Sequence, residues 1–281
     1  MHFEELERYV LLFVHSCDGT QTKRAMQARV TAIIPIFGYA RQDRKDKSRA
    51  PISAKVIADI LRTAGVDRVV TIDLHAPQIQ GFVNFPIDNL FGEPLLKKYL
   101  KDTLSDVDSS DLVVVSPDAG GAKRADALAK ELKAGLAIMS KKRDKPGVVA
   151  RMTLVGDVKD KTCVIVDDMV DTAGTLTRAA KELIQAGAKD VYASAVHGVL
   201  SDPAIQRINE SPIKEFIVTD TIPMDKNEKR CPKMRVVSVA PLLAEAVKRI
   251  HLGGSLSNLF RDAPGNDEQN TEGGIGKWSL D

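Results

Sequence analysis

The stretch CVIVDDMVDTAGT, residues 163–175, decides the fold of this chain. Its four leading apolar residues predict a buried strand, and apolar residues at helical spacing through 176–184 predict a helix directly afterwards. Between the two lie the adjacent carboxylates of Asp167 and Asp168 and a loop of small residues. A strand that leads through such a loop into a helix N-terminus favours phosphate binding, because free backbone N–H groups and the helix dipole converge there.

The two neighbouring carboxylates add a sugar-binding function to this phosphate loop. Asp167 and Asp168 can accept hydrogen bonds from two adjacent sugar hydroxyls, so the stretch predicts a ribose 5-phosphate site. The alternative is that Asp171 and Thr172 only cap the helix. That alternative leaves Asp167 and Asp168 unexplained, since they precede any cap and would crowd like charges without structural benefit.

Apolar runs and helix-period segments alternate along the rest of the chain, which predicts an α/β fold with parallel-rich sheets flanked by helices. The strand-like runs are Val30–Ile36, Val69–Ile72, Leu112–Val115, Leu136–Met139, Cys163–Val166, Val191–Val196, Phe216–Val218 and Val236–Val239. Besides the helix after the opening stretch, helical periodicity occupies Ile52–Ala64, Ala122–Leu132 and Leu242–Ile250.

Size and composition set broad limits on the function. The chain has 281 residues, enough for two compact domains, and its net charge of +2 gives no reason to expect nucleic acid or a membrane as a partner. The apolar run Tyr9–Val14 is too short to span a membrane and follows acidic residues, unlike a signal peptide. Cys17, Cys163 and Cys231 follow no metal-binding pattern. We therefore expect a cytoplasmic protein.

Residues 111–124, DLVVVSPDAGGAKR, repeat the order of strand, small-residue turn and helix. Two adjacent glycines allow a ligand to approach the backbone closely, and Lys123 and Arg124 add positive charge. A pyrophosphate or a second phosphate would fit this turn. The alternative is a glycine-rich turn followed by a solvated basic helix start.

An acid and a histidine, Asp73 and His75, lie where another predicted strand ends, at the edge where open α/β sheets bind ligands. A lone histidine is more often structural than functional. Magnesium prefers oxygen ligands, so His75 would be an unusual ligand and Asp118, after a different strand, a more conventional one.

Two basic segments also follow strands. Residues 41–49 carry five basic residues directly after an aromatic pair that could stack a base, and Arg41 could contact triphosphate oxygens. Residues 141–147 could form a mobile clamp over a transferring phosphoryl group. Each segment alone could be a solvated loop. Together with the sites above, they indicate a phosphorylated sugar and a nucleoside triphosphate.

With these segments taken together, the chain closely resembles the ribose-phosphate pyrophosphokinases, and the resemblance runs from about Lys23 to Phe260. The matching segments are Phe37–Asp46, Ser48–Lys55, Asp73–Gly81, Ser116–Arg124, Lys141–Arg143, Val155–Asp160 and Val166–Thr175. The segments FGYARQDRK and DLHA would not occur in a simple phosphoribosyltransferase.

The resemblance implies that the β,γ-pyrophosphoryl group of ATP passes to the 1-hydroxyl of ribose 5-phosphate, giving phosphoribosyl pyrophosphate and AMP. It also implies residue roles. ATP would be contacted by Arg41, Gln42 and Asp46, Mg²⁺ would be held by His75 and Asp118, and Lys141 and Arg143 would stabilise the transition state from a mobile loop. Asp167 and Asp168 would bind the ribose hydroxyls, and Asp171, Thr172, Ala173, Gly174 and Thr175 the 5-phosphate. Ser48 and Arg49 match part of a regulatory site for phosphate and ADP.

The resemblance further implies two phosphoribosyltransferase-like domains. Residues 1–92, completed by about 248–260, would form the first, and residues 93–247 would form the second and carry the ribose 5-phosphate site. Residues 261–281, rich in polar residues and glycine, are expected to be disordered. Family members assemble into hexamers built from dimers, so we expect a homo-oligomer or a hetero-oligomer with full-length relatives.

The N-terminus departs from the family pattern. Family members begin with a longer region whose RFSDGE-like segment contributes to the adenine pocket of a neighbouring subunit, and residues 1–22 do not resemble it. We expect an N-terminally shortened or divergent form whose first domain is incomplete and has an unpaired sheet edge. The alternative function is therefore a non-catalytic or regulatory subunit associated with full-length synthetases. A third alternative, a type I phosphoribosyltransferase, would release pyrophosphate only with a base.

Overall fold

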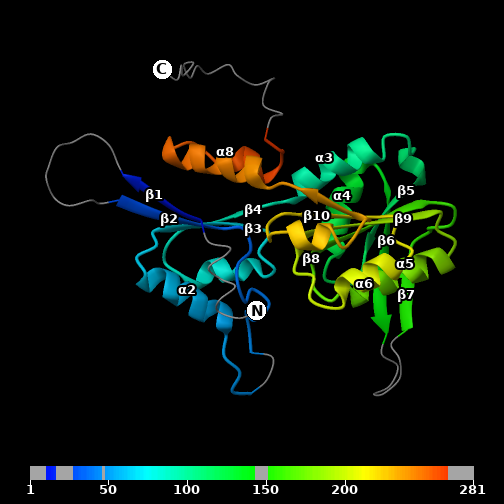
Figure 1. Cartoon of the computed structure of the whole chain (residues 1–281), viewed down its shortest axis with the longest axis horizontal. Coiled ribbons are helices and arrows are strands. Elements are labelled where there is room, and N and C mark those ends of the chain that lie inside the picture. Colours follow the sequence, from blue (N-terminus) through cyan, green and yellow to red (C-terminus); the bar gives the residue numbers. More distant parts are fainter. Residues whose placement is uncertain (1–10, 17–27, 46–47, 143–150, 265–281) are drawn as a thin grey trace, which may run out of the picture.

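The computed structural model of the chain describes residues 11–16, 28–45, 48–142 and 151–264. For 11–16, 28, 141–142 and 151–152 it describes the backbone alone. Two β-sheets lie next to each other, each with helices on both faces (Figure 1). In this part of the chain no helix is long and apolar enough to cross a membrane.

The N-terminal sheet has the strand order β1-β2-β3-β4. Strands β2 (Ala28–Ile34), β3 (Arg68–Ile72) and β4 (Ile87–Leu90) are parallel to one another. Strand β1 (Leu11–Ser16) runs antiparallel to β2 at the edge of the sheet. The core strands form from β-branched residues that are buried on both faces, as is usual for a parallel sheet.

The C-terminal sheet has the order β11-β10-β9-β8-β5-β6-β7, and only the edge strand β7 runs antiparallel to its neighbour. Its strands are β5 (Leu112–Ser116), β6 (Gly135–Lys142), β7 (Arg151–Val155), β8 (Thr162–Val170), β9 (Asp190–Gly198), β10 (Glu215–Thr219) and β11 (Met234–Val237). Strand β8, which contains Asp167 and Asp168, lies between β5 and β9 in the middle of the sheet.

Helices cover both faces of the two sheets (Figure 1). They are α2 (Ser53–Thr63), α3 (Glu93–Thr103), α4 (Ala122–Leu132), α5 (Gly174–Gln185), α6 (Ala204–Glu210), α7 (Asp225–Glu228) and α8 (Ala240–His251), with short 3-10 turns η1 (Pro77–Phe82), η2 (Ser109–Asp111) and η3 (Ser257–Phe260). Leu176 of α5 and Ile205 of α6 belong to one buried apolar cluster, and Leu96 of α3 and Leu128 of α4 to another on the opposite face.

The last helix joins the two sheets. Helix α8 follows β11 of the C-terminal sheet but lies over the N-terminal sheet (Figure 1). Leu242 and Ala246 of α8 share one buried cluster with Val70 of β3 and with Val164 of β8. One apolar core therefore continues across both sheets and fixes them relative to each other.

The predicted α/β class with parallel-rich sheets is confirmed. Six of the eight strand-like runs lie within strands, whereas Val30–Ile36 and Val236–Val239 each extend two residues beyond the ends of β2 and β11. Three strands were not predicted, namely β1, β4 and the antiparallel β7. Helix α3, which begins after Gly92, was read in the sequence only as a domain boundary. The division into residues 1–92 and 93–247 stays a prediction, and most of the predicted tail lies outside the described residues.

Candidate active site

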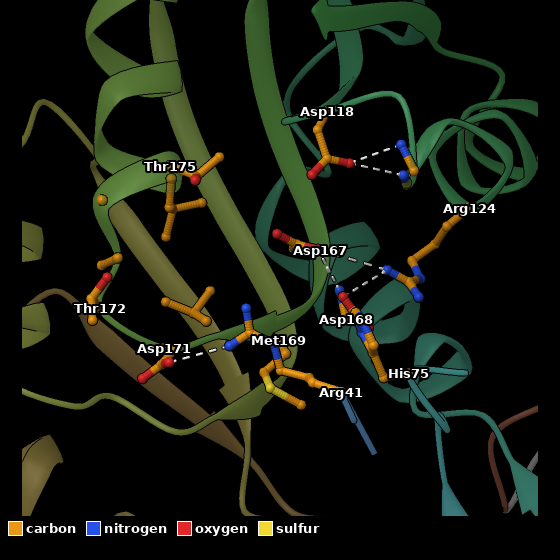
Figure 2. A pocket seen from close by; sticks show the side chains of 16 residues that line it. Arg41, His75, Asp118, Arg124, Asp167, Asp168, Met169, Asp171, Thr172 and Thr175 are labelled. Carbon is orange, nitrogen blue, oxygen red and sulfur yellow. Dashed lines mark hydrogen bonds and ion pairs between the residues drawn. The ribbon is translucent and has the colours of Figure 1, made fainter. Parts of the chain in front are cut away.

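A pocket of about 510 Å³ opens where β5 and β8 end, at the side of the C-terminal sheet that faces the N-terminal sheet (Figure 2). Its lining residues are Arg41, His75, Asp118, Gly120, Gly121, Arg124 and all residues from Asp167 to Leu176. Because the carboxyl ends of parallel strands meet at one edge, the loops after β5 and β8 become neighbours, although paired residues of the two strands, such as Leu112 and Thr162, are 50 positions apart in the sequence.

The loop after β8 leads directly into α5 and forms one wall of the pocket. Ala173 adopts a positive φ of 56° at the residue before the helix, so the chain turns sharply there. Arg207 of α6 donates a hydrogen bond from Nη1 to the carbonyl oxygen of Thr172 at 2.9 Å and so stabilises the loop. The first residues of α5, 174–176, line the pocket. Their backbone N–H groups have no acceptors within the helix.

The two adjacent carboxylates hold different partners. Asp168 Oδ2 lies 2.6 Å from His75 Nδ1, and its Oδ1 lies 3.6 Å from Arg124 Nη1. Asp167 Oδ1 accepts the backbone N–H of Asp168 at 2.9 Å and lies 3.9 Å from the same Arg124 nitrogen. Figure 2 shows Asp168 between Arg124 and His75, with Asp167 beside Asp168.

These partners separate the pKa values of the two acids. Burial, followed by the neighbouring Asp168, raises the pKa of Asp167 to about 7. Burial also acts to raise the pKa of Asp168, but the hydrogen bonds that its carboxylate accepts from His75 and from Asp167, with the charge of Arg124, lower it below its usual range. The hydrogen bond to Asp168 in turn raises the pKa of His75. The pocket thus holds one firmly ionised carboxylate beside one that titrates near neutral pH.

Arg41 reaches the pocket from the loop after β2. Its Nη1 lies 3.2 Å from Asp171 Oδ2 in the phosphate loop, and the arginine side chain is 59% exposed. The other carboxylate oxygen of Asp171 is buried and has no hydrogen-bond partner among the residues that the structure describes. An ion pair between the two sheets therefore crosses the pocket, and its cation is accessible to an anionic ligand.

The sequence left two interpretations of the glycine-rich loop after β5, a phosphate-binding turn and a plain glycine-rich turn. Asp118 Oδ1 accepts the backbone N–H groups of Gly120 and Gly121 at 2.9 and 3.1 Å. The amides of Gly120 and Gly121 are thus already bonded within the loop. Arg124, which the sequence indicated only as added positive charge, lies beside the carboxylates of Asp167 and Asp168.

Several predicted site residues converge on this pocket, and others do not. Arg41, His75, Asp118 and residues 167–175 line it together, whereas Gln42, Ser48 and Arg49 are exposed and are not among its lining residues. Lys141 lies in β6, where its backbone pairs with Met152, so its backbone belongs to a strand. Asp46 and Arg143 lie outside the described residues.

Magnesium ligands are only partly indicated by the geometry. Within the described ranges, no group of three or more His, Cys, Asp or Glu side chains is placed to hold a metal ion. His75 bonds to Asp168, while Asp118 presents its carboxylate on the opposite side of the pocket (Figure 2). Mg²⁺ commonly takes one or two carboxylates and completes its shell with water and substrate phosphates, so Asp118 fits such an ion and His75 fits less well.

Sequence reasoning missed two residues near the site. Arg124 was noted only as a positive charge, although its position at the start of a helix after a glycine turn was a usable signal. His197 was not noted at all, although it ends an apolar strand as His75 does. It is buried where the two sheets meet.

The two parallel-rich sheets and the strand–loop–helix pocket between them define a phosphoribosyltransferase-like α/β protein. Two family models match the chain, "N-terminal domain of ribose phosphate pyrophosphokinase" over residues 11–65 and "Phosphoribosyl synthetase-associated domain" over residues 139–261. The chain belongs to the ribose-phosphate pyrophosphokinase family. The first match begins at residue 11, which corrects the expectation that the resemblance starts near Lys23.

Individual relatives agree with this assignment. Ribose-phosphate pyrophosphokinase A of Dictyostelium discoideum is 53% identical over 85% of this chain and 74% of its own length. Ribose-phosphate pyrophosphokinase of Caldanaerobacter subterraneus is 56% identical over 85% of this chain and 74% of its own length. The crystal structure of phosphoribosylpyrophosphate synthetase from Mycobacterium smegmatis has a TM-score of 0.74 and 46% identity, covering 80% of this chain and 72% of that one.

Proposed function

We propose that this chain is an enzyme that transfers pyrophosphate from ATP to the 1-hydroxyl of ribose 5-phosphate, releasing AMP and phosphoribosyl pyrophosphate. The observation that carries the proposal is the placement of Asp167 and Asp168 beside a phosphate loop, with Arg41 reaching the same pocket from the other sheet. A carboxylate pair beside a phosphate loop suits a phosphorylated sugar, and an accessible arginine suits a polyphosphate.

The sugar half of the site follows from the loop after β8. Residues 171–175 and the first turn of α5 bind the 5-phosphate, since the N–H groups and the helix dipole favour an anion there. Asp167 and Asp168 accept hydrogen bonds from the two ribose hydroxyls. His75 and Arg124 hold the Asp168 carboxylate between them, which limits the rearrangement that binding requires.

The nucleotide half begins with Arg41. Triphosphate oxygens compete with the Asp171 carboxylate for this guanidinium, so ATP binding exchanges one anionic partner for another. Gln42 and Asp46 complete the predicted contacts to ATP. Lys141 and Arg143 are proposed to offset the charge that develops as the ribose 1-hydroxyl oxygen attacks the β-phosphorus and the bond to AMP breaks.

Mg²⁺ is the proposed cofactor, with Asp118 and, less directly, His75 as its protein ligands. When bound, such an ion neutralises charge on the phosphoryl oxygens. Ser48 and Arg49 as a regulatory site, a hexamer built from dimers and a cytoplasmic location stay predictions.

The decisive experiment measures AMP formation from ATP and ribose 5-phosphate with magnesium, using the purified chain. Formation that requires both substrates supports the proposal. The variant Asp167→Asn should lose ribose 5-phosphate binding, whereas Asp102→Asn, on the exposed face of α3, should not. AMP formation only after a full-length relative is added would instead favour the regulatory alternative. Pyrophosphate release that depends on a base and not on ATP would favour a phosphoribosyltransferase.

A further inference from the structure

The turn that carries His75 is shaped by several contacts from outside its own strand. Strand β3 ends at Ile72, and Asp73 then adopts a positive φ of 43°, which is unfavourable for a residue other than glycine. A backbone held in this region needs support from its surroundings. The direction of this turn decides where His75 points.

His197 provides part of that support from the other sheet. It lies on β9, next to Met169 of β8, and its side chain is buried. Its Nε2 lies 3.0 Å from the carbonyl oxygen of Ile72 and 3.2 Å from that of Asp73. A residue of the C-terminal sheet therefore hydrogen-bonds to the backbone at the end of β3, where the turn begins.

The surroundings of His197 fix the orientation of its ring. Both groups near Nε2 are carbonyl oxygens, which only accept, so Nε2 carries the proton and donates. Burial lowers the pKa of His197 to about 4, so the ring is neutral at physiological pH and its Nδ1 accepts a hydrogen bond from the hydroxyl of Thr221, 2.9 Å away. Both ring nitrogens are thus engaged, and the ring cannot rotate without losing a hydrogen bond.

Two further contacts hold the same turn. The side-chain oxygen of Asn89 accepts the backbone N–H of Leu74 at 2.8 Å, and the carboxylate of Asp73 accepts the N–H of Gly92 at 2.7 Å. These groups belong to the segment that includes β4 and leads into α3, and they lie on the N-terminal side of the joint. Among the described residues, the C-terminal sheet donates hydrogen bonds to the backbone of this turn through His197.

We propose that His197 is a positioning residue for the reaction, which acts through the turn at residues 72–75 to place His75 against Asp168 and so orients the ribose-binding carboxylate. The proposal rests on the proposed function for its biological meaning. It follows from three observations: His197 holds the turn backbone, the turn carries His75, and His75 Nδ1 lies 2.6 Å from Asp168 Oδ2.

The test uses two amides that differ in reach. In His197→Gln the side-chain nitrogen can occupy the position of Nε2 and still donate to the carbonyl oxygens of the turn. In His197→Asn the nitrogen reaches only the position of Nδ1, so the turn loses its donor. The dissociation constant for ribose 5-phosphate is measured by calorimetry, and KM for both substrates by AMP formation. Each variant is also made in a His75→Ala background.

We expect His197→Asn to weaken ribose 5-phosphate binding about tenfold and His197→Gln about threefold or less. KM for ATP, measured with saturating Mg²⁺ because His75 is also a proposed ligand of that ion, should stay within about twofold of its original value in both variants. In the His75→Ala background, the further effect of His197→Asn should fall to about twofold or less, because the residues act in one chain of contacts. Should His197→Asn not fold, Thr221→Val removes the hydroxyl beside Nδ1, together with its longer contacts to Thr219 Oγ1 and the carbonyl oxygen of Val196, and should weaken ribose 5-phosphate binding in the same selective way.

If the losses of ribose 5-phosphate affinity caused by His197→Asn and by His75→Ala multiply in the double variant, the two residues act independently and the inference is overturned. Equal rises of KM for both substrates, or equal losses in the Asn and Gln variants, would overturn it as well. Calorimetry keeps the two proposals separate. If the original chain binds ribose 5-phosphate but forms no AMP, the transfer function fails while the variant series still tests the positioning role.

Discussion

Replacing Asp167 with asparagine should stabilise the protein at neutral and alkaline pH while removing its sugar binding. The neutral side chain keeps the carbonyl oxygen that accepts the N–H of Asp168, so the local geometry is preserved. What is lost is a buried negative charge beside Asp168. Burial and this neighbour raise the pKa of Asp167 from 3.8 to about 7 in the folded protein.

The sign of the effect follows from proton linkage. Between pH ~4 and ~7 the folded protein binds more protons at Asp167 than the unfolded chain does, so folding stability falls as the pH rises through this window. The change in pKa corresponds to ~4 kcal/mol at ~1.4 kcal/mol per pH unit. Because 26% of the side chain is exposed and solvent screens it, we expect about half of this, ~2 kcal/mol.

Urea denaturation at several pH values measures the effect. The free energy of unfolding of Asp167→Asn should equal that of the original chain near pH 4 and exceed it by ~2 kcal/mol at pH 8. The variant Asp102→Asn, which removes an exposed carboxylate from α3, should show no such divergence. A difference that does not depend on pH, or an Asp167→Asn variant that is less stable at pH 8, would refute the reasoning.

Three further predictions concern the nucleotide side and the fold. Arg41→Ala should raise KM for ATP about tenfold in steady-state assays, since it removes the cation that pairs with Asp171; an unchanged KM would exclude the ATP role. Lys141→Ala should abolish AMP formation while calorimetric ribose 5-phosphate binding stays nearly intact, and equal loss of both would contradict a transition-state role. Gly156→Ala should lower the free energy of unfolding by more than ~2 kcal/mol, because at φ 120° its Cβ would lie 2.8 Å from the carbonyl oxygen of Leu136. Gly65→Ala, at φ 84° with nothing within 4 Å, should cost less in the same urea titration.

The sequence predicted those parts of the fold that local pattern encodes. Continuous apolar runs such as Cys163–Val166 became central strands because burial on both faces leaves no polar positions. Strand β4, IDNL, was missed because only its first and last residues are apolar, and its Asn89 serves the neighbouring turn. Strand β1 pairs antiparallel with β2 at the sheet edge, an orientation that local pattern does not specify.

The site was predicted as a set of residues but not as a network. That residues 167–175 line a pocket follows from the order of strand, loop and helix. That His75 would bond to Asp168, 93 residues away, depends on how two sheets meet, and periodicity carries no information about that. For the same reason the sequence indicated Asp118 only as a possible magnesium ligand and did not show that one of its carboxylate oxygens accepts the amides of its own loop.

The position of α8 has a consequence for how the chain folds during synthesis. The N-terminal sheet is made first, but Leu242 and Ala246, which share its apolar cluster, follow about 170 residues after β3. Until α8 emerges, that face of the sheet stays exposed to water and to other chains. Contacts between residues so far apart in the sequence also form slowly. A ribosome that stalls between β5 and α8 would therefore present an incomplete chain that is prone to aggregate. A chaperone or a partner chain would then have to cover the apolar face in place of α8.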